Sequence, residues 1–246
     1  MKNFVIDIGN NRTKLGLFEN GSLVAKEVLI TDRESKILEW LTNHQPKNII
    51  LSTVGQPLPT ELEQQLSTSS LYFIKLSQDT PLPIQNQYQT PETLGKDRIA
   101  AVIGASVHFP NEHCVIVDAG TCITYEVLHA EKGYLGGNIA PGLYMRFKAM
   151  HAFTANLPLV ENEEVEQPIG YSTKSAMQNG GQLGCLYEIE GFVAEMEAKM
   201  GAVNVILTGG DADFFAKKLK RKIFVHHNLV LEGLNKILSY NVEELE

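Results

Sequence analysis

The chain has 246 residues, 43% of them hydrophobic and 20% charged, which is typical of a globular protein with a full hydrophobic core. Its formal net charge of −8 argues against the basic surface that nucleic-acid binding requires, so we expect no nucleic-acid partner. The sequence contains neither a signal-peptide pattern nor an apolar run of about 18 residues, so we expect a cytoplasmic protein without membrane contact.

The first half of the chain is predicted to form three strands, then a helix, then a fourth strand. The predicted strands are residues 4–8, 14–18, 23–29 and 48–53. Glu19-Asn20-Gly21 is typical of a hairpin turn between the second and third strands. Ile37, Trp40 and Leu41 recur at helical spacing and predict an amphipathic helix before the fourth strand.

The second half repeats this plan. Its predicted strands are residues 114–117, 123–128, 134–139 and 203–207, and a helix is predicted over residues 172–200. Gly180, Gly181 and Gly184 weaken this helix, so they either permit close contact across a dimer or mark a break. The repeat predicts two domains, residues 1–110 and 111–246. Three cysteines, Cys114, Cys122 and Cys185, form no CxxC pair and are expected to be reduced and buried.

The first strand of each half ends in the same pattern, Asp7-Ile8-Gly9-Asn10 and Asp118-Ala119-Gly120-Thr121. Each copy alone is typical of an ordinary turn. Two copies at matched positions favour a phosphate site, because such turns direct backbone N–H groups into one concavity and glycine admits a phosphate. A carboxylate at the strand end is a suitable ligand for Mg²⁺, and Lys14 adds a cation.

A third glycine-rich turn, Thr208-Gly209-Gly210, follows the last predicted strand. It allows a base or ribose to approach the backbone, although ordinary strand-to-helix turns carry the same residues. Neither a GxxxxGK[ST] nor a GxGxxG pattern occurs, which disfavours a P-loop kinase and a Rossmann dehydrogenase.

Five motifs in this order resemble the type III pantothenate kinase family, and the resemblance covers nearly the whole chain. They are Asp7-Ile8-Gly9-Asn10 with Lys14, Gly95-Lys96-Asp97-Arg98, Asp118-Ala119-Gly120-Thr121, Gly136-Gly137-Asn138-Ile139-Ala140-Pro141-Gly142 and Thr208-Gly209-Gly210. The resemblance implies an α/β fold of two tandem ribonuclease-H-like domains with mixed sheets flanked by helices, the architecture of actin-like ATPases and sugar kinases. It also implies conversion of ATP and pantothenate to ADP and 4′-phosphopantothenate, the first step of coenzyme A synthesis, by a homodimer that uses Mg²⁺ and K⁺ or NH₄⁺.

The resemblance implies Asp97 as the general base, although Asp is also favoured in the first turn of any helix. It implies that the substrate is held by Tyr88, Gly95, Lys96, Arg98 and Thr173. Arg98 suits the pantothenate carboxylate, since its planar fork binds that group in two places. Thr173 would act from the other subunit, but Ser172 and Thr173 are equally suited to cap a helix.

The implied ATP contacts are Asp7, Gly9, Asn10, Asn11, Lys14, Thr121, Gly209 and Gly210. Asp7 would lie near Mg²⁺, and Asp118 near the monovalent cation. The chain departs from the family at Asn11, where Thr or Ser is common, and at Cys122, where Ala is common.

Two other functions fit the same fold: a kinase for another small alcohol, and a nucleotide-binding regulator without catalysis. Asp97 beside Arg98 argues against the regulator, since a scaffold needs no base there. Tyr88 and Arg98 argue against a neutral sugar, which has no carboxylate for Arg98 to bind.

Overall fold

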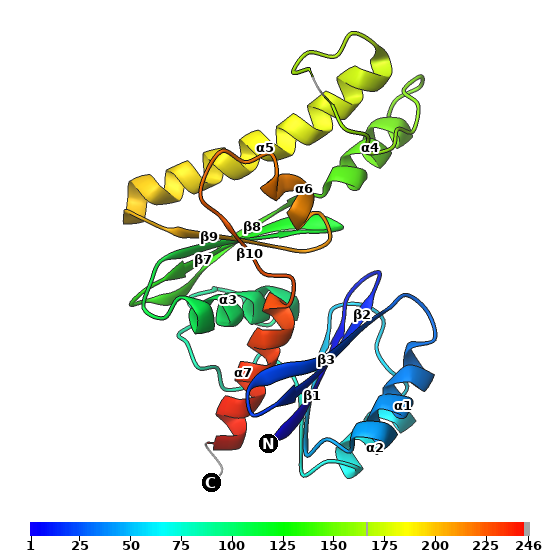
Figure 1. Ribbon diagram of the computed structural model, residues 1–246, viewed down its shortest axis with the longest axis vertical. Helices are drawn as coiled ribbons and strands as arrows, with labels where there is room; N and C mark the ends of the chain where they lie inside the picture. The colour runs from blue at the N-terminus through cyan, green and yellow to red at the C-terminus, as the bar shows by residue number, and fades with distance from the viewer. Residues whose placement is uncertain (166, 244–246) are drawn as a thin grey trace. The chain divides into compact units, whose positions relative to one another are not determined.

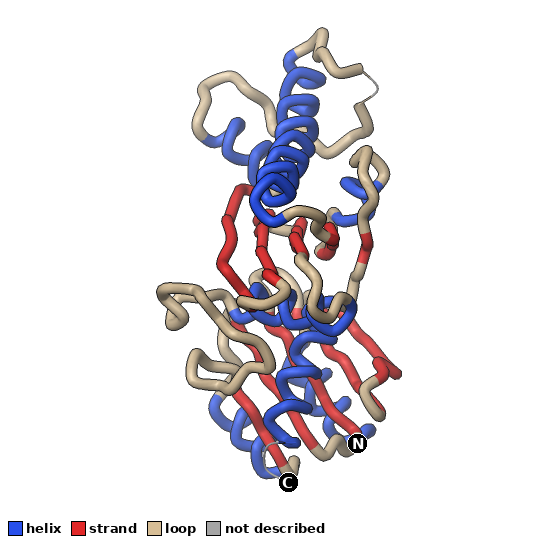
Figure 2. The backbone as a smooth tube through the Cα atoms, turned by 90° about the vertical axis from the view of Figure 1, so that its left-hand side faces the viewer, coloured by secondary structure: helices blue, strands red, loops and turns tan. Residues whose placement is uncertain are grey.

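The computed structural model describes residues 1–165 and 167–243, which fold into two compact units (Figures 1 and 2). The first unit contains Met1–Asn111, Glu131–Leu135 and the chain from Asn228 onward, and the second contains Glu112–Ala130 and Gly136–His227. The sequence-based division at residue 110 separates the units at nearly the same place. It differs in assigning residues 131–135 and the C-terminal helix to the second domain.

The first unit is built on a five-stranded sheet of order β3-β2-β1-β4-β5. Its strands are β1 (Lys2–Ile8), β2 (Thr13–Glu19), β3 (Ser22–Leu29), β4 (Asn48–Thr53) and β5 (Tyr72–Lys75). Strand β1 pairs antiparallel with β2 and parallel with β4. Helices α1 (Arg33–His44) and α2 (Thr60–Thr68) cover one face, and α7 (Leu229–Glu243) covers the other with α3 (Lys96–His108) packed against it (Figure 1).

Side-chain alternation along β1 explains why the C-terminal helix joins this unit. Phe4 and Ile6 pack into the core beneath α1 and α2, where Trp40 stacks on Phe4. Asn3 faces the opposite side, and its Nδ2 donates to Oδ1 of Asn235 on α7 at 2.9 Å. Without α7, this second face of the sheet would be exposed to water, so the helix completes the core of the first unit.

The second unit has a sheet of order β10-β9-β6-β7-β8. Its strands are β6 (Cys114–Ala119), β7 (Cys122–His129), β8 (Gly133–Pro141), β9 (Asn204–Thr208) and β10 (Phe224–Val225). The sheet repeats the first in connectivity, since β6 pairs antiparallel with β7 and parallel with β9. The predicted duplicated α/β fold with mixed sheets flanked by helices is therefore confirmed.

Helix α5 (Thr173–Met200) packs on this sheet through Ile189 and Val193, while α4 (Leu143–Ala152) and α6 (Ala212–Ala216) complete the unit (Figure 1). Helix α5 is continuous over its 28 residues, so its glycines mark no break. None of the helices in the described residues combines the length and hydropathy needed to cross a bilayer.

We predict that Gly233→Ala destabilises the first unit by about 1–3 kcal/mol, because overpacking a tight interface has a cost of this size. A Cβ at Gly233 would lie 1.8 Å from the carbonyl oxygen of Ala100 on α3. Trp40 is the only tryptophan and lies in the core of this unit, so its fluorescence during urea unfolding reports the change. Gly191→Ala, in the second unit and without a neighbour within 4 Å, should leave the Trp40 transition unchanged. If Gly233→Ala unfolded at the same urea concentration as the wild type, the result would contradict the close packing of α3 and α7.

Candidate active site

The loop after β1 carries the first of the paired Asp-x-Gly motifs. Asp7 lies near the end of β1 with only 4% of its surface exposed, and its Oδ1 accepts a hydrogen bond from Ser52 Oγ at 3.3 Å. The turn that follows is closed by Gly9 N donating to Arg12 O at 3.0 Å. The side chains of Asn10, Asn11 and Arg12 are exposed. The turn therefore presents a buried carboxylate and several amide and guanidinium donors within a few residues.

Gly55, which the sequence pattern did not single out, holds this loop from the neighbouring strand. The backbone N–H groups of Val54 and Gly55 both donate to Ile8 O, at 3.0 and 3.2 Å. A Cβ at Gly55 would lie 2.4 Å from Gly9 O, so only glycine permits this approach. The sequence signal that could have identified Gly55 is its position just after β4, the strand that pairs parallel with β1.

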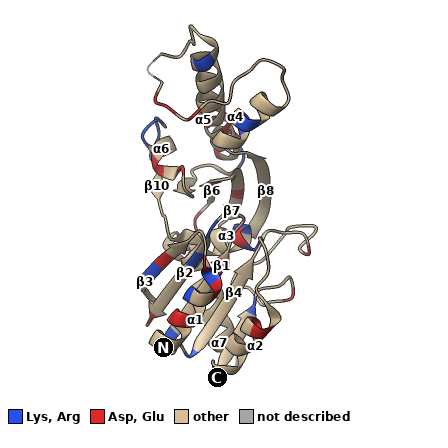
Figure 3. Ribbon diagram, turned by 90° about the vertical axis from the view of Figure 1, so that its right-hand side faces the viewer, with Lys and Arg blue, Asp and Glu red and all other residues tan. Residues whose placement is uncertain are grey.

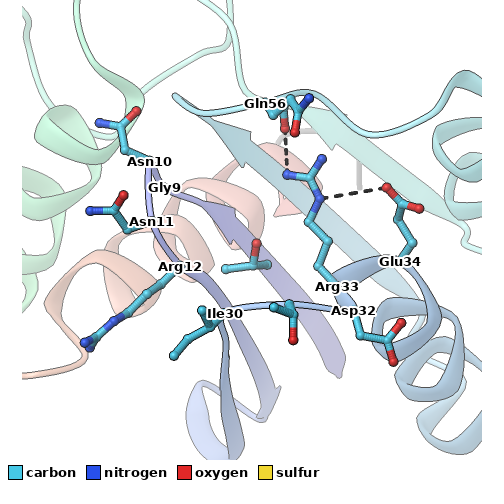
Figure 4. A pocket seen from close by; sticks show the side chains of 11 residues that line it. Gly9, Asn10, Asn11, Arg12, Ile30, Asp32, Arg33, Glu34 and Gln56 are labelled. Atoms are coloured by element: carbon cyan, nitrogen blue, oxygen red, sulfur yellow. Dashed lines mark hydrogen bonds and ion pairs between the residues drawn. The ribbon is translucent and has the colours of Figure 1, made fainter.

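A cavity of about 350 Å³ lies beside the loop, between it and the start of α1 (Figure 4). Gly9, Asn10 and Asn11 line it as part of the predicted ATP site, and Arg12 is a further cation that was not predicted. Lys14 lies on β2 opposite Asp7 and does not line the cavity. The far wall is fixed by Arg33, whose guanidinium donates to Gln56 O at 2.8 Å and Pro57 O at 2.9 Å.

The N-terminus of α3 carries the Gly95-Lys96-Asp97-Arg98 motif. Gly95 is the N-cap residue, and Asp97 Oδ1 accepts from the backbone N–H of Arg98 at 2.9 Å. A Cβ at Gly95 would lie 2.6 Å from the same carboxylate oxygen. The Asp97 carboxylate is thus partly buried, folded back over the first turn, and stabilised there by the helix dipole. Lys96 Nζ makes a long contact with Leu94 O at 3.4 Å.

Arg98 points into the first unit and meets the predicted substrate tyrosine. Its side chain is buried, with 6% of the residue exposed. Its Cζ lies 5.4 Å from the centre of the Tyr88 ring, and Nη1 donates to Tyr88 Oη at 3.4 Å. A cation over an aromatic face is an attractive arrangement, and it gives the guanidinium a defined orientation. Tyr88, Asp97 and Arg98 are therefore gathered around one helix end.

The second unit carries the matching loop. Asp118 lies near the end of β6, next to Thr208 in the register with β9, and Gly120 N donates to Cys122 O at 2.9 Å to close the turn. Gly142 N donates to Thr121 O at 3.2 Å, so the fourth motif supports the turn. The side chain of Thr121 is exposed.

The two glycines of the third turn differ in role. Gly209 has a φ of +93°, and its Cβ would lie 2.5 Å from Asp118 Oδ1 and 2.3 Å from Ala119 O. Gly209 therefore serves close backbone packing against the loop of Asp118. Gly210 is exposed, and a Cβ placed there would meet no neighbour within 4 Å, so its surroundings are open to a ligand.

Thr173 lies in the second unit, whereas Asp97, Arg98 and Tyr88 lie in the first. The N-cap of α5 is Ser172, whose Oγ accepts from Ser175 N at 3.2 Å in a reciprocal capping box. The capping function thus belongs to Ser172, and Thr173 begins the helix with an exposed side chain.

Comparison with known proteins identifies the family. The model of type III pantothenate kinases matches residues 3–195. The chain belongs to this family. It is 44% identical over 241 residues to a type III pantothenate kinase of Bacteroides fragilis, covering 97% of this chain and 98% of the relative. It is 40% identical over 243 residues to one of Porphyromonas gingivalis, covering 98% and 99%.

Solved structures agree at the level of the fold. A ROK hexokinase from Thermus thermophilus superposes with a TM-score of 0.52 at 14% identity, covering 98% of this chain and all of that one. A glucokinase from an Antarctic psychrotroph gives 0.51 at 11% identity, covering 97% and 99%. This pantothenate kinase family member therefore shares the two-domain fold of sugar kinases.

The three cysteines of this family member have different surroundings. Burial raises the pKa of the Cys114 thiol to about 12 and that of Cys185 to about 11, because the apolar core disfavours a thiolate. Cys122, which follows Thr121, is only partly buried.

We predict that one thiol per native chain, Cys122, reacts with Ellman's reagent at pH 8. Cys114 and Cys185 stay protonated because pH 8 lies well below both raised pKa values, and they are buried as well. In denaturant all three should react. Cys122→Ser should abolish the native reaction, and two fast-reacting thiols in the native wild type would contradict this burial.

Proposed function

We propose that the chain transfers the γ-phosphoryl group of ATP to the 4′-hydroxyl of pantothenate. Membership of the type III pantothenate kinase family supports this activity. The observation that carries it in the structure is the gathering of a carboxylate, a buried guanidinium and a tyrosine at the N-terminus of α3. A short anionic alcohol needs these groups: a base for its hydroxyl and a cation for its carboxylate.

Asp97 acts as the general base in this proposal. Its carboxylate takes the hydroxyl proton as the substrate oxygen bonds to the γ-phosphorus and the bond from that phosphorus to the β–γ bridging oxygen breaks. ADP leaves with the bridging oxygen, and the proton remains on Asp97 until it passes to water. The hydrogen bond from Arg98 N holds the carboxylate in one orientation, which such a transfer requires.

The family's ATP dependence brings a divalent metal, and we propose Mg²⁺ with K⁺ or NH₄⁺. Asp7 and Asp118 fit these ions, because both are oxygen ligands at strand ends beside turns with exposed polar side chains. When bound, the cations would neutralise charge on the phosphate chain. The exposed donors Asn10, Asn11, Arg12 and Thr121 suit the phosphate oxygens, and open backbone at Gly210 suits adenosine.

We also propose a homodimer in which Thr173 of one subunit completes the substrate site of the other. The support is a pair of exposed apolar side chains, Ile169 and Tyr171, just before the start of α5 in the second unit. Exposed apolar side chains gathered near one element are typical of an interaction surface. The exposed position of Thr173 beside this group suits a contribution in trans.

We expect Asp97→Asn to lower kcat by roughly 10²–10⁴-fold, the usual contribution of a positioned base. ADP release would be measured with MgATP, pantothenate and K⁺, with ATP affinity from titration calorimetry unchanged. Asp79→Asn, the same change at an exposed position, should retain wild-type turnover. Full activity in Asp97→Asn would remove Asp97 as the base. A wild type that binds ATP but releases no ADP with pantothenate, in K⁺ or NH₄⁺, would overturn the proposed activity.

We expect Arg98→Lys to raise the KM for pantothenate by roughly tenfold to a hundredfold, because an ammonium cannot replace the two-point contact of a guanidinium with a carboxylate. Pantothenol, which carries an alcohol in place of that carboxylate, should be a poor substrate of the wild type. The difference between the two substrates should shrink in the variant. Arg221→Lys, at a partly exposed arginine paired with Glu190 and Glu197 in the second unit, is the matched control. An unchanged preference for pantothenate in Arg98→Lys would show that Arg98 does not bind the carboxylate.

A further inference from the structure

Residues 131–135, the end of a hairpin turn and the first residues of β8, belong to the first unit and contact the loop that carries Tyr88. Gln87 N donates to Tyr134 O, and Tyr134 N donates to Gln85 O, both at 2.9 Å. These bonds make a single parallel bridge between Asn86 and Tyr134. That bridge is the only strand-like pairing in residues 78–93, so the turn fixes a segment without regular structure of its own.

Gly133 permits this contact. It has a φ of +74°, and a Cβ there would lie 2.2 Å from the carbonyl oxygen of Gln85. A side chain at this position would be strained in the backbone and would push the two segments apart. The close approach of the turn to residues 85–87 therefore depends on glycine.

Tyr134 continues the contact with its ring. It is fully buried, and its ring is stacked on that of Tyr88 with centroids 6.0 Å apart and planes inclined by 3°. Tyr88 in turn meets the guanidinium of Arg98 through its ring and hydroxyl. Asn86 Oδ1 accepts from Tyr88 N at 3.0 Å, which fixes the backbone beneath the ring. The contacts thus run without a break from Tyr134 through Tyr88 to Arg98.

We infer that Tyr134 and Gly133 are positioning residues for pantothenate, holding Tyr88 and through it Arg98 in the orientation that binds the substrate. The inference rests on the proposed function. Neither residue touches the phosphate loops of Asp7 or Asp118 in the contacts described above. Their effect should therefore fall on the affinity for pantothenate and leave ATP and the chemical step unchanged.

The test compares steady-state constants of the wild type, Tyr134→Leu, Tyr134→Phe and Gly133→Ala. Tyr134→Leu should raise the KM for pantothenate about tenfold, since a stacked aromatic pair is lost, with kcat and the KM for ATP within about twofold. Tyr134→Phe keeps the ring and should restore the wild-type KM. Gly133→Ala should reproduce the rise in KM without altering the stack directly. Leu135→Ala, the neighbouring and more exposed position, should behave as wild type.

A double-mutant cycle separates positioning from general stability. In a Tyr88→Leu background, Tyr134→Leu should have no further effect on the pantothenate KM, because it acts through the ring already removed. Additive effects of the two substitutions would overturn the inference. So would an unchanged KM for pantothenate in both Tyr134→Leu and Gly133→Ala, or a fall in kcat together with equal rises in the KM values for pantothenate and ATP. The wild-type rate with pantothenate in the same assay tests the proposed function separately, because only an inactive wild type would contradict the proposed kinase activity.

Discussion

Parallel pairing of the hairpin strand with the next strand of the sheet is the constraint on which both halves of this molecule depend. In the first unit it sets Asp7 of β1 beside Ser52 of β4, and in the second it sets Asp118 of β6 beside Thr208 of β9. Parallel strands end at the same edge of a sheet, so the loops that follow them must share a small space. Glycine resolves the crowding in both cases, Gly55 against Gly9 and Gly209 against Ala119.

This arrangement explains how an acidic chain can be built to bind polyphosphate. Apart from a basic run at residues 217–222 beside α6, Lys and Arg are interspersed with Asp and Glu along the elements drawn in Figure 3. The donors that we propose for this binding are local, namely the exposed Asn and Thr side chains of the two turns and Arg12. Such directed donors act over short distances and are less dependent on net charge than a basic surface is.

Much of the fold was predictable because it depends on local periodicity. The strands at residues 4–8 and 114–117 are short apolar runs, and both are confirmed as β1 and β6. The place of α7 was not predictable, because its apolar face would suit either sheet and its partners, such as Asn3 on β1 and Ala100 on α3, are distant in sequence. The contact between Tyr134 and Tyr88 was not predictable either, because the two residues are distant in sequence and Tyr88 lies in a segment without periodicity. The motif residues were found in sequence because each occupies a strand end or a helix start, whose local pattern is short and readable.

The N-terminus of α3 carries a carboxylate and a guanidinium on the adjacent residues Asp97 and Arg98, and helix geometry directs the two groups apart. Successive residues of a helix point about 100° apart, so the Asp97 carboxylate turns back over the N-terminus while Arg98 extends toward Tyr88. One rigid turn thereby fixes both the proposed base and the proposed carboxylate anchor. Tyr88 alone lies on a segment with no helix or strand to hold it, and any freedom left there would have to be lost when substrate binds. Two backbone hydrogen bonds and a stacked ring from residues 131–135 remove that freedom beforehand, so the least regular wall of the proposed site is ordered by the start of β8 together with its own bond from Tyr88 N to Asn86.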